Sequence, residues 1–188
     1  MKKLTFLLSL TIFLFTGCKS NNTTVADSNN TVEQESSDAN KGQAFIENDG
    51  STPNILQIAI GSKDHTTLVA AVQAAELENS LANAGPLTVF APTNEAFAAL
   101  PEGTVENLLK PENKDALANI IKYHAMPGNY SADFLKNFPK LGMANDKSVT
   151  VEVADGEVLI GGAKILGSVP AGNGIVHVID KVLLPPTE

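Results

Sequence analysis

Few side chains in this 188-residue sequence could perform chemistry, since it holds one cysteine, three histidines and no arginine or tryptophan. Because Cys18 is the only thiol, the chain can form neither an internal disulfide nor a metal site with several thiolates. His65, His124 and His177 are too widely spaced for a His-x-x-x-His metal pair. The sequence also lacks a Gly-x-Ser-x-Gly nucleophile turn and a calcium-binding loop. We therefore expect a protein that is not an enzyme and that needs no metal or cofactor.

Two of the histidines lie within apolar patterns. His124 falls on the apolar face of a predicted helix with Leu117 and Ile121, and His177 has the same strand parity as Ile179. A neutral imidazole can be buried when its ring nitrogens are hydrogen-bonded. We expect both histidines to be structural core residues, each bonded to a buried backbone group.

Three aromatic residues surround a short helix that the sequence predicts at 131–138: Tyr130, Phe134 and Phe138. A spacing of four residues puts the two phenylalanines on one helix face, and such pairs usually belong to a core. The alternative is that the three rings form an exposed apolar patch, which would mark a binding surface. The sequence favours the core for the two phenylalanines and leaves Tyr130 as a candidate binding residue.

The first 18 residues have the pattern of an export signal. Two lysines precede an apolar run over 4–15. This run of about 12 residues is shorter than the roughly 20 that span a bilayer. Residues 15–18, Phe-Thr-Gly-Cys, resemble a bacterial lipobox, with Phe15 where leucine is usual. The resemblance implies cleavage of 1–17, lipidation of Cys18 and attachment to the bacterial cell envelope, on its periplasmic or cell-surface face.

The next segment, 19–52, is rich in serine, asparagine, threonine and acidic residues, and its few apolar residues have no helical or strand period. Such a segment buries too little apolar surface to offset its chain entropy. Six acidic residues against two lysines favour an extended chain. We predict that 18–52, the lipidated cysteine included, is a disordered leash with a reach of roughly 30 Å. A folded domain is expected over 53–188.

The folded part changes its hydrophobic period along the chain. Helical spacing dominates the first half, where Thr66 or Thr67, and later Thr93, stand at expected helix N-caps. Period-two alternation dominates from Ser148 onward, with hairpin signals at Asp-Gly and Asn-Gly pairs. Helices followed by an antiparallel sheet predict an α+β fold.

One acidic residue interrupts this strand pattern. Asp180 stands in an otherwise apolar stretch, and a carboxylate in such a place needs a hydrogen-bond partner. We expect it to bond the turn at Thr93 and Asn94.

Three blocks of the folded part resemble the fasciclin-like (FAS1) domain. They are Thr-Val-Phe-Ala-Pro-Thr-Asn-Glu-Ala-Phe at 88–97, the pair Tyr123-His124, and Gly-Asn-Gly-Ile-Val-His-Val-Ile-Asp-Lys-Val-Leu-Leu-Pro at 172–185. The blocks occur in the family's order and spacing, and the similarity covers 53–188. The resemblance implies a wedge-shaped β-sandwich decorated by several short helices. Within its blocks we expect structural roles for Thr93, Asn94, His177 and Asp180.

The same resemblance implies a function. The family's usual role is adhesion, by extracellular or surface domains that bind matrix, carbohydrate, lipid or other proteins. In animal members the Tyr-His motif is linked to receptor binding, so Tyr123 and His124 join Tyr130 as candidate binding residues. The expected partners are the membrane, through the lipid, and an unknown protein, carbohydrate or matrix ligand. A binding module for a small ligand, lipid or glycan is the alternative.

The charge of the chain argues against one class of partner. Its formal net charge is −8, and without arginine it offers no guanidinium fork for phosphate. Nucleic-acid binding depends on clustered positive charge. We therefore expect no nucleic-acid partner.

Overall fold

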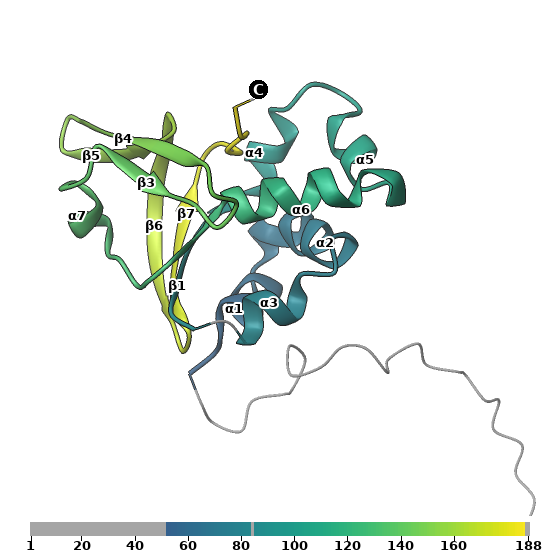
Figure 1. Ribbon diagram of the computed structural model, residues 1–188, viewed down its shortest axis with the longest axis horizontal. Coiled ribbons are helices and arrows are strands. Elements are labelled where there is room, and N and C mark those ends of the chain that lie inside the picture. The colour runs from purple at the N-terminus through teal and green to yellow at the C-terminus, as the bar shows by residue number, and fades with distance from the viewer. Residues whose placement is uncertain (1–51, 84, 187–188) are drawn as a thin grey trace, which may run out of the picture. The chain divides into compact units, whose positions relative to one another are not determined.

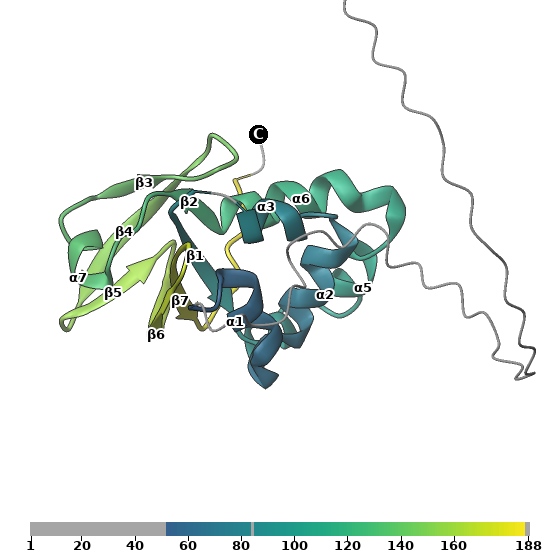
Figure 2. The same ribbon diagram turned by 90° about the horizontal axis from the view of Figure 1, so that it is seen from below.

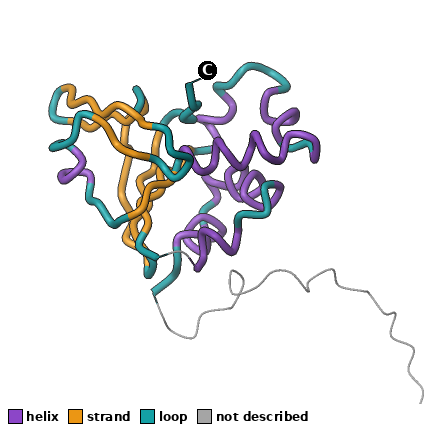
Figure 3. Tube along the Cα trace, in the orientation of Figure 1, coloured by secondary structure: helices purple, strands orange, loops and turns teal. Residues whose placement is uncertain are grey.

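The computed structural model describes residues 52–83 and 85–186. The predicted signal, the lipidation of Cys18 and nearly all of the predicted leash lie outside the described residues. Figure 1 shows most of the helices gathered on one side and the sheet on the other, and Figure 3 shows the same separation by colour. The helices come mainly first along the chain and most strands later, so the predicted α+β class is confirmed.

The helical half is built from short helices. They are α1 (Ile55–Gly61), α2 (Thr66–Ala74), α3 (Glu78–Asn83), α4 (Asn94–Ala98), α5 (Thr104–Leu108) and α6 (Lys114–Tyr123), with 3-10 turns at Lys63–His65 and Pro111–Asn113. A further helix, α7 (Ala132–Leu135), lies apart from these at the outer side of the sheet (Figure 1). Among the described residues, no helix is both long enough and apolar enough to cross a bilayer.

Side-chain caps explain where several helices begin. Asn54 and Gln57 form a capping box at α1, with N–H to side-chain distances of 2.8 and 2.9 Å. Thr93 caps α4 as predicted, since its hydroxyl accepts a hydrogen bond from Ala96 N. The predicted cap at Thr66 or Thr67 is wrong. The N–H of Thr67 instead donates to the side-chain oxygen of Asn94 at 3.0 Å, so a residue from α4 completes the start of α2.

The strands form one sheet in the order β2-β1-β7-β6-β5-β4-β3. Their bounds are β1 (Leu87–Pro92), β2 (Ala125–Pro127), β3 (Lys140–Gly142), β4 (Ser148–Ala154), β5 (Glu157–Ile160), β6 (Ala163–Ala171) and β7 (Gly174–Ile179). Neighbours pair antiparallel except β1 and β7, which run parallel from Leu87 opposite Gly174 to Pro92 opposite Ile179. A Cβ at Gly174 would lie 1.9 Å from the Leu87 oxygen, so this close approach requires glycine.

The sheet curls until its two edges meet at one point. Ala144, just beyond β3, donates its N–H to the carbonyl of Ala125 in β2 at 2.8 Å. Figure 2 shows β3 at the margin of the sheet, with β4 and β5 beside it. Along the rest of their length β2 and β3 do not pair, so a gap is left between two strand edges.

Apolar side chains fill two regions. One lies between the helices and β1 and β7, around Leu56, Val72 and Ile121. The other lies inside the curled sheet, where Leu135, Ile160 and Ile179 are completely buried. The second region provides the floor of the site described next.

Candidate binding surface

A groove of about 290 Å³ opens in the gap between β2 and β3, beside α7. Its buried floor and its more exposed rim come from the loop before α7, from α7 itself and from the two strands. The lining residues are Met126, Tyr130, Phe134, Leu135, Phe138, Lys140, Leu141 and Gly142. Although most of this lining is apolar, Phe134 and Phe138 are 44% and 40% exposed. An apolar hollow that remains accessible in this way is typical of a binding surface.

The aromatic rings of this groove form a continuous wall. Tyr130 and Phe134 stack with ring centroids 5.3 Å apart and an angle of 8° between their planes. Phe134 and Phe138 follow at 5.1 Å with a tilt of 53°. Contacts of this geometry stabilise aromatic pairs by about 0.5–1.5 kcal/mol beyond the area they bury. The wall is therefore formed before any partner binds.

The core interpretation of the two phenylalanines is wrong, and the length of α7 explains why. The helix ends at Leu135, so Phe138 lies beyond it and does not continue the face of Phe134. Leu135 is the residue of this helix that enters the core, with no exposed surface. The rings are left at the surface, as the alternative interpretation expected.

Tyr130 is held in place from two strands. Its N–H donates to the Thr88 hydroxyl at 3.0 Å, and that hydroxyl donates to the carbonyl of Gly128 at 2.9 Å. His177 in β7 donates from Nε2 to the Tyr130 carbonyl at 2.8 Å. Gly128 has a φ of +104°, and a Cβ there would lie 2.3 Å from the Tyr130 ring. These contacts fix the loop that carries the first ring of the wall.

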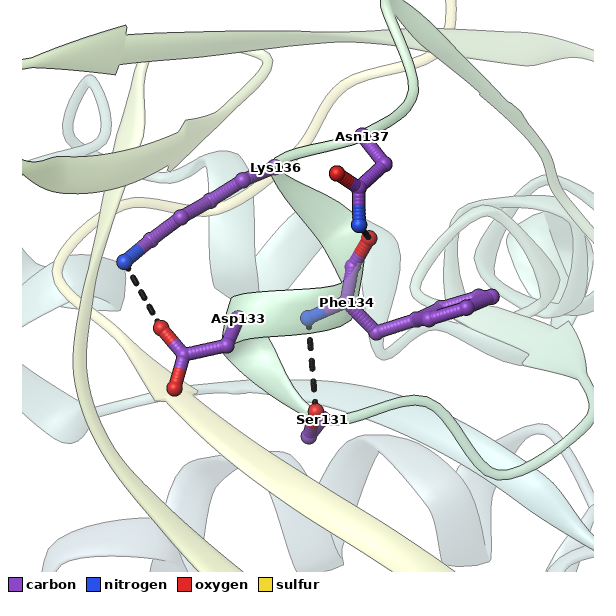
Figure 4. A network of polar contacts seen from close by, with 5 residues as sticks. All are labelled: Ser131, Asp133, Phe134, Lys136 and Asn137. Atoms are coloured by element: carbon purple, nitrogen blue, oxygen red, sulfur yellow. Dashed lines mark hydrogen bonds and ion pairs between the residues drawn. The ribbon is translucent and has the colours of Figure 1, made fainter.

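A network of polar contacts closes α7 (Figure 4). Ser131 caps the helix by accepting from Phe134 N at 3.3 Å, and the Asn137 amide donates to the Phe134 carbonyl at 3.0 Å. Lys136 Nζ lies 2.7 Å from an oxygen of Asp133, and this hydrogen bond lowers the pKa of the Asp133 carboxyl. The Phe134 ring projects away from the ion pair. The helix thus uses its polar groups locally and leaves its aromatic side chain for the groove.

The predicted binding pair Tyr123 and His124 lies in the interior. Tyr123 is 5% exposed and donates its hydroxyl to the Ser148 carbonyl at 3.0 Å. His124 is 4% exposed, with Nδ1 2.8 Å from the Ile120 carbonyl and Nε2 accepting from Leu183 N at 2.9 Å. The structural role expected of this histidine is confirmed. A binding role for the pair stays a prediction.

His177 also bonds to the backbone, as expected. Because the Tyr130 carbonyl can only accept, Nε2 carries the proton, and Nδ1 accepts from the Ser168 hydroxyl at 2.7 Å. Burial lowers the pKa of this imidazole, which also stacks on Phe90 at 5.7 Å. A serine–histidine bond can activate a nucleophile. Here the ring has no exposed surface, and both of its nitrogens are bonded within the chain.

The remaining residues with predicted structural roles are Asp180 and Asn94, and each has hydrogen-bond partners of its own. The Asp180 carboxylate accepts from Lys164 N at 2.8 Å, so its expected bond to the turn at Thr93 and Asn94 is wrong. The pairing of β6 with β7 brings Lys164 next to this carboxylate. Asn94 instead contacts the start of α2 and the Lys63 carbonyl. Among residues 52–83 and 85–186, no group of three or more His, Cys, Asp or Glu side chains could hold a metal ion.

Sequence reasoning identified Tyr130 but missed the residues that hold it. Thr88 lies inside the first fasciclin-like block, but the resemblance assigns it no contact of its own. A hydroxyl in a strand that is otherwise apolar was the available signal, because a buried hydroxyl needs partners. Nothing in the sequence singles out Lys140 and Gly142, because they line the groove only through the position of β3 at the edge of the sheet.

Comparison with known proteins agrees with this architecture. Residues 63–185 match the family model described as Fasciclin domain. Protein sll1483 of Synechocystis sp. is 48% identical over 137 residues, which cover 72% of this chain and 76% of that protein. Transforming growth factor-beta-induced protein ig-h3 of Sus scrofa is 35% identical over 133 residues, 70% of this chain and 19% of that protein.

A solved structure has the same fold. It is that of a FAS1 domain pair from the insect cell adhesion molecule fasciclin I. Its TM-score is 0.63 at 19% sequence identity, over 70% of this chain and 51% of that chain. By its sequence match over 63–185 and by its fold, this chain belongs to the fasciclin domain family.

Proposed function

We propose that this chain is an exported, non-enzymatic lipoprotein of the bacterial cell envelope, which binds an extracellular protein or matrix partner in an adhesion role. The observation that carries the proposal is the aromatic wall of half-buried Tyr130 and exposed Phe134 and Phe138 over a groove of about 290 Å³. The lipobox-like residues that end at Cys18 support export and anchoring. The similarity in fold to a cell adhesion molecule supports the adhesion role.

The chemistry of the groove favours an apolar side chain over a sugar or a small polar ligand. Sites for small ligands combine an apolar lining with several convergent polar groups. In this groove the polar side chains of the lining are Lys140 and Tyr130, and the other lining residues are apolar or glycine. Aromatic anchors in shallow pockets are typical of protein interfaces.

The buried histidines support a binding role without catalysis. Each of His124 and His177 donates from one ring nitrogen and accepts at the other, which requires a neutral ring, and burial lowers the pKa of both. Neither is positioned to exchange a proton with a bound molecule.

A pair of substitutions tests the proposal. Phe134→Ser removes the central ring of the wall, whereas Leu166→Ser removes a similarly exposed apolar side chain in β6, outside the groove. We expect the first to weaken binding of the purified chain to an immobilised envelope and matrix extract of the producing organism at least fivefold, and the second to leave it unchanged. Equal binding by both variants, or normal attachment of cells that lack the chain, would contradict the proposal.

A further inference from the structure

The groove lies along β3. The hydrogen bonds between β3 and β4 can be derived from the contacts just before and just after β3. Val151 N donates to the Pro139 carbonyl at 3.0 Å, and Met143 N donates to the Lys147 carbonyl at 2.8 Å. Bonded and non-bonded pairs alternate along an antiparallel ladder. Leu141, midway between these two contacts, is therefore also bonded to β4.

The residues on either side of Leu141 have the opposite orientation. Lys140 and Gly142 direct their backbone N–H and C=O groups away from β4, toward the gap between β3 and β2. Both residues also line the aromatic groove. Unsatisfied backbone groups and an apolar hollow therefore lie side by side, and an added strand needs both.

We infer that the partner binds by adding an extended segment to the open edge of β3, with one apolar side chain inserted against Phe134 and Phe138. This inference rests on the proposed binding function and specifies its mode. Backbone hydrogen bonds to Lys140 and Gly142 supply affinity, and the groove selects the side chain between them.

The structure keeps this edge accessible. A Cβ built on Gly142 meets no atom within 4 Å, so a neighbouring backbone can approach closely. The facing edge, β2, ends in Pro127, which has no N–H to donate, and Ala125 already accepts from Ala144. Neither residue can exchange both an N–H and a C=O bond with an incoming strand, so we place the complete pairs on β3.

Charge defines the occupant further. Lys136 is neutralised by Asp133 at 2.7 Å, but within the described part of the chain Lys140 forms no ion pair. The chain as a whole has a net charge of −8, so this cation beside the groove is a local exception. The occupant that fits is an extended peptide segment with an apolar residue at its centre and a carboxylate next to it.

The first experiment identifies such a segment and tests the groove. Displayed random nine-residue peptides are selected on the purified full chain in detergent, with counter-selection on Phe134→Ser. We expect enriched peptides with a central apolar residue, an adjacent acid and no proline at the paired positions. Failure to enrich any peptide over the Phe134→Ser background would overturn the inference, while the proposed function would still be decided by the binding of Phe134→Ser and Leu166→Ser to the extract.

Amide hydrogen exchange then distinguishes strand addition from simple insertion of a side chain. In the free chain we expect the Leu141 amide to be protected by β4, and those of Lys140 and Gly142 to exchange rapidly. Binding of a selected peptide should slow exchange at Lys140 and Gly142 at least tenfold. If the peptide binds and depends on Phe134 but leaves these two amides unprotected, the strand model is wrong and the proposed binding surface stands. Protection without peptide, in a dimeric chain, would show that a second copy occupies the edge and would also overturn the inference.

A matched pair of substitutions gives an independent test. Gly142→Pro removes the outward N–H without removing a bond to β4, and proline is tolerated at such edge positions. Gly142→Ala keeps the N–H and adds a methyl group into open space. We expect the proline variant to lose at least tenfold in affinity for the selected peptide while the alanine variant binds normally. Equal affinity of the two variants, at unchanged exchange protection of Leu141, would refute the added strand.

Discussion

At the scale of single residues, His124 and His177, two of the three buried histidines, act as fixed hydrogen-bond bridges with opposite tautomers. His124 donates from Nδ1 to the Ile120 carbonyl, because Nε2 must accept from the N–H of Leu183. His177 donates from Nε2 and accepts at Nδ1. A second proton on either ring would turn the accepting nitrogen into a donor that faces another donor. Both bridges therefore require a neutral imidazole.

This requirement makes stability depend on pH. Burial lowers the pKa of His124 from 6.5 to about 4, against a smaller opposing effect of its bond to Ile120. Above pH 6.5 the ring is neutral in both states and the stabilisation is complete. Between pH 6.5 and 4 the unfolded chain takes up a proton that the folded chain does not, so the free energy of unfolding falls by about 3 kcal/mol in total. The lowered pKa of His65 and of His177 acts in the same direction.

Urea unfolding of purified chain at pH 7.5 and pH 4.5 measures this loss. The variant His124→Gln, which cannot titrate, should show a smaller difference between the two pH values than the unmodified chain. Lys122→Gln, an exposed change two residues before His124, should show the same difference as the unmodified chain. Identical pH dependence in all three chains would contradict the assignment to His124.

At the scale of secondary-structure elements, asparagine side chains join segments that are distant in sequence. Asn173, in the turn between β6 and β7, accepts from Ile55 N at 2.9 Å and donates to the carbonyls of Leu81 and Ala82. Its own carbonyl accepts from Leu87 N at 3.0 Å. One turn residue thereby connects α1, α3 and β1.

Removal of the Asn173 side chain should lower the free energy of unfolding by more than a substitution in a turn usually does. Asn173→Ala leaves one backbone N–H and two carbonyls without their partner, which we expect to lower the free energy of unfolding by about 2–3 kcal/mol. Asn137→Ala, which removes a single exposed bond just after α7, should cost less than about 1 kcal/mol. Denaturant unfolding compares the two. If Asn173→Ala lowered the free energy of unfolding by no more than Asn137→Ala, the contacts of the Asn173 side chain would add little to stability.

Elements with a clear period could be predicted from the sequence, and those without one could not. The start of α4 at Thr93 and the two hairpins follow from a cap residue, strand alternation and turn residues. The strands β2 and β3 have three residues each, too few for a period to show. The parallel pairing of β1 with β7 joins residues 87 positions apart, as in Leu87 with Gly174, and no local pattern encodes it. The gap that holds the groove depends on these two features.

At the scale of the whole molecule, the predicted anchor determines where binding takes place. Removal of the predicted signal would take two lysines and no acid from a chain of net charge −8, which leaves −10. Many copies held in one membrane gain avidity from modest single affinities. A lipid on Cys18 would therefore be part of the proposed adhesion function and not only a means of localisation.

Cys18→Ser tests the anchor directly. We expect this variant to lose incorporation of labelled fatty acid and to appear in the soluble fraction, because two or more acyl chains make a stable attachment. Phe15→Leu, which restores the usual residue of the lipobox, should keep both the label and the membrane fraction. Fatty-acid labelling of the Cys18→Ser chain would contradict the predicted site.

The contact of Pro53 with the turn between β6 and β7 has a mechanical consequence. Gly172, at the turn between β6 and β7, donates its N–H to the Pro53 carbonyl at 2.9 Å. A pull on the chain at Thr52 that is resisted by a partner on β3 therefore passes sideways through the sheet, from β6 to β5, β4 and β3. The shortest ladder on this route is that of β5 with β6, in which Leu159 pairs with Lys164 and Ile160 with Ala163. Under load, this short ladder would be the first to separate and would limit the tension that the adhesive bond could sustain.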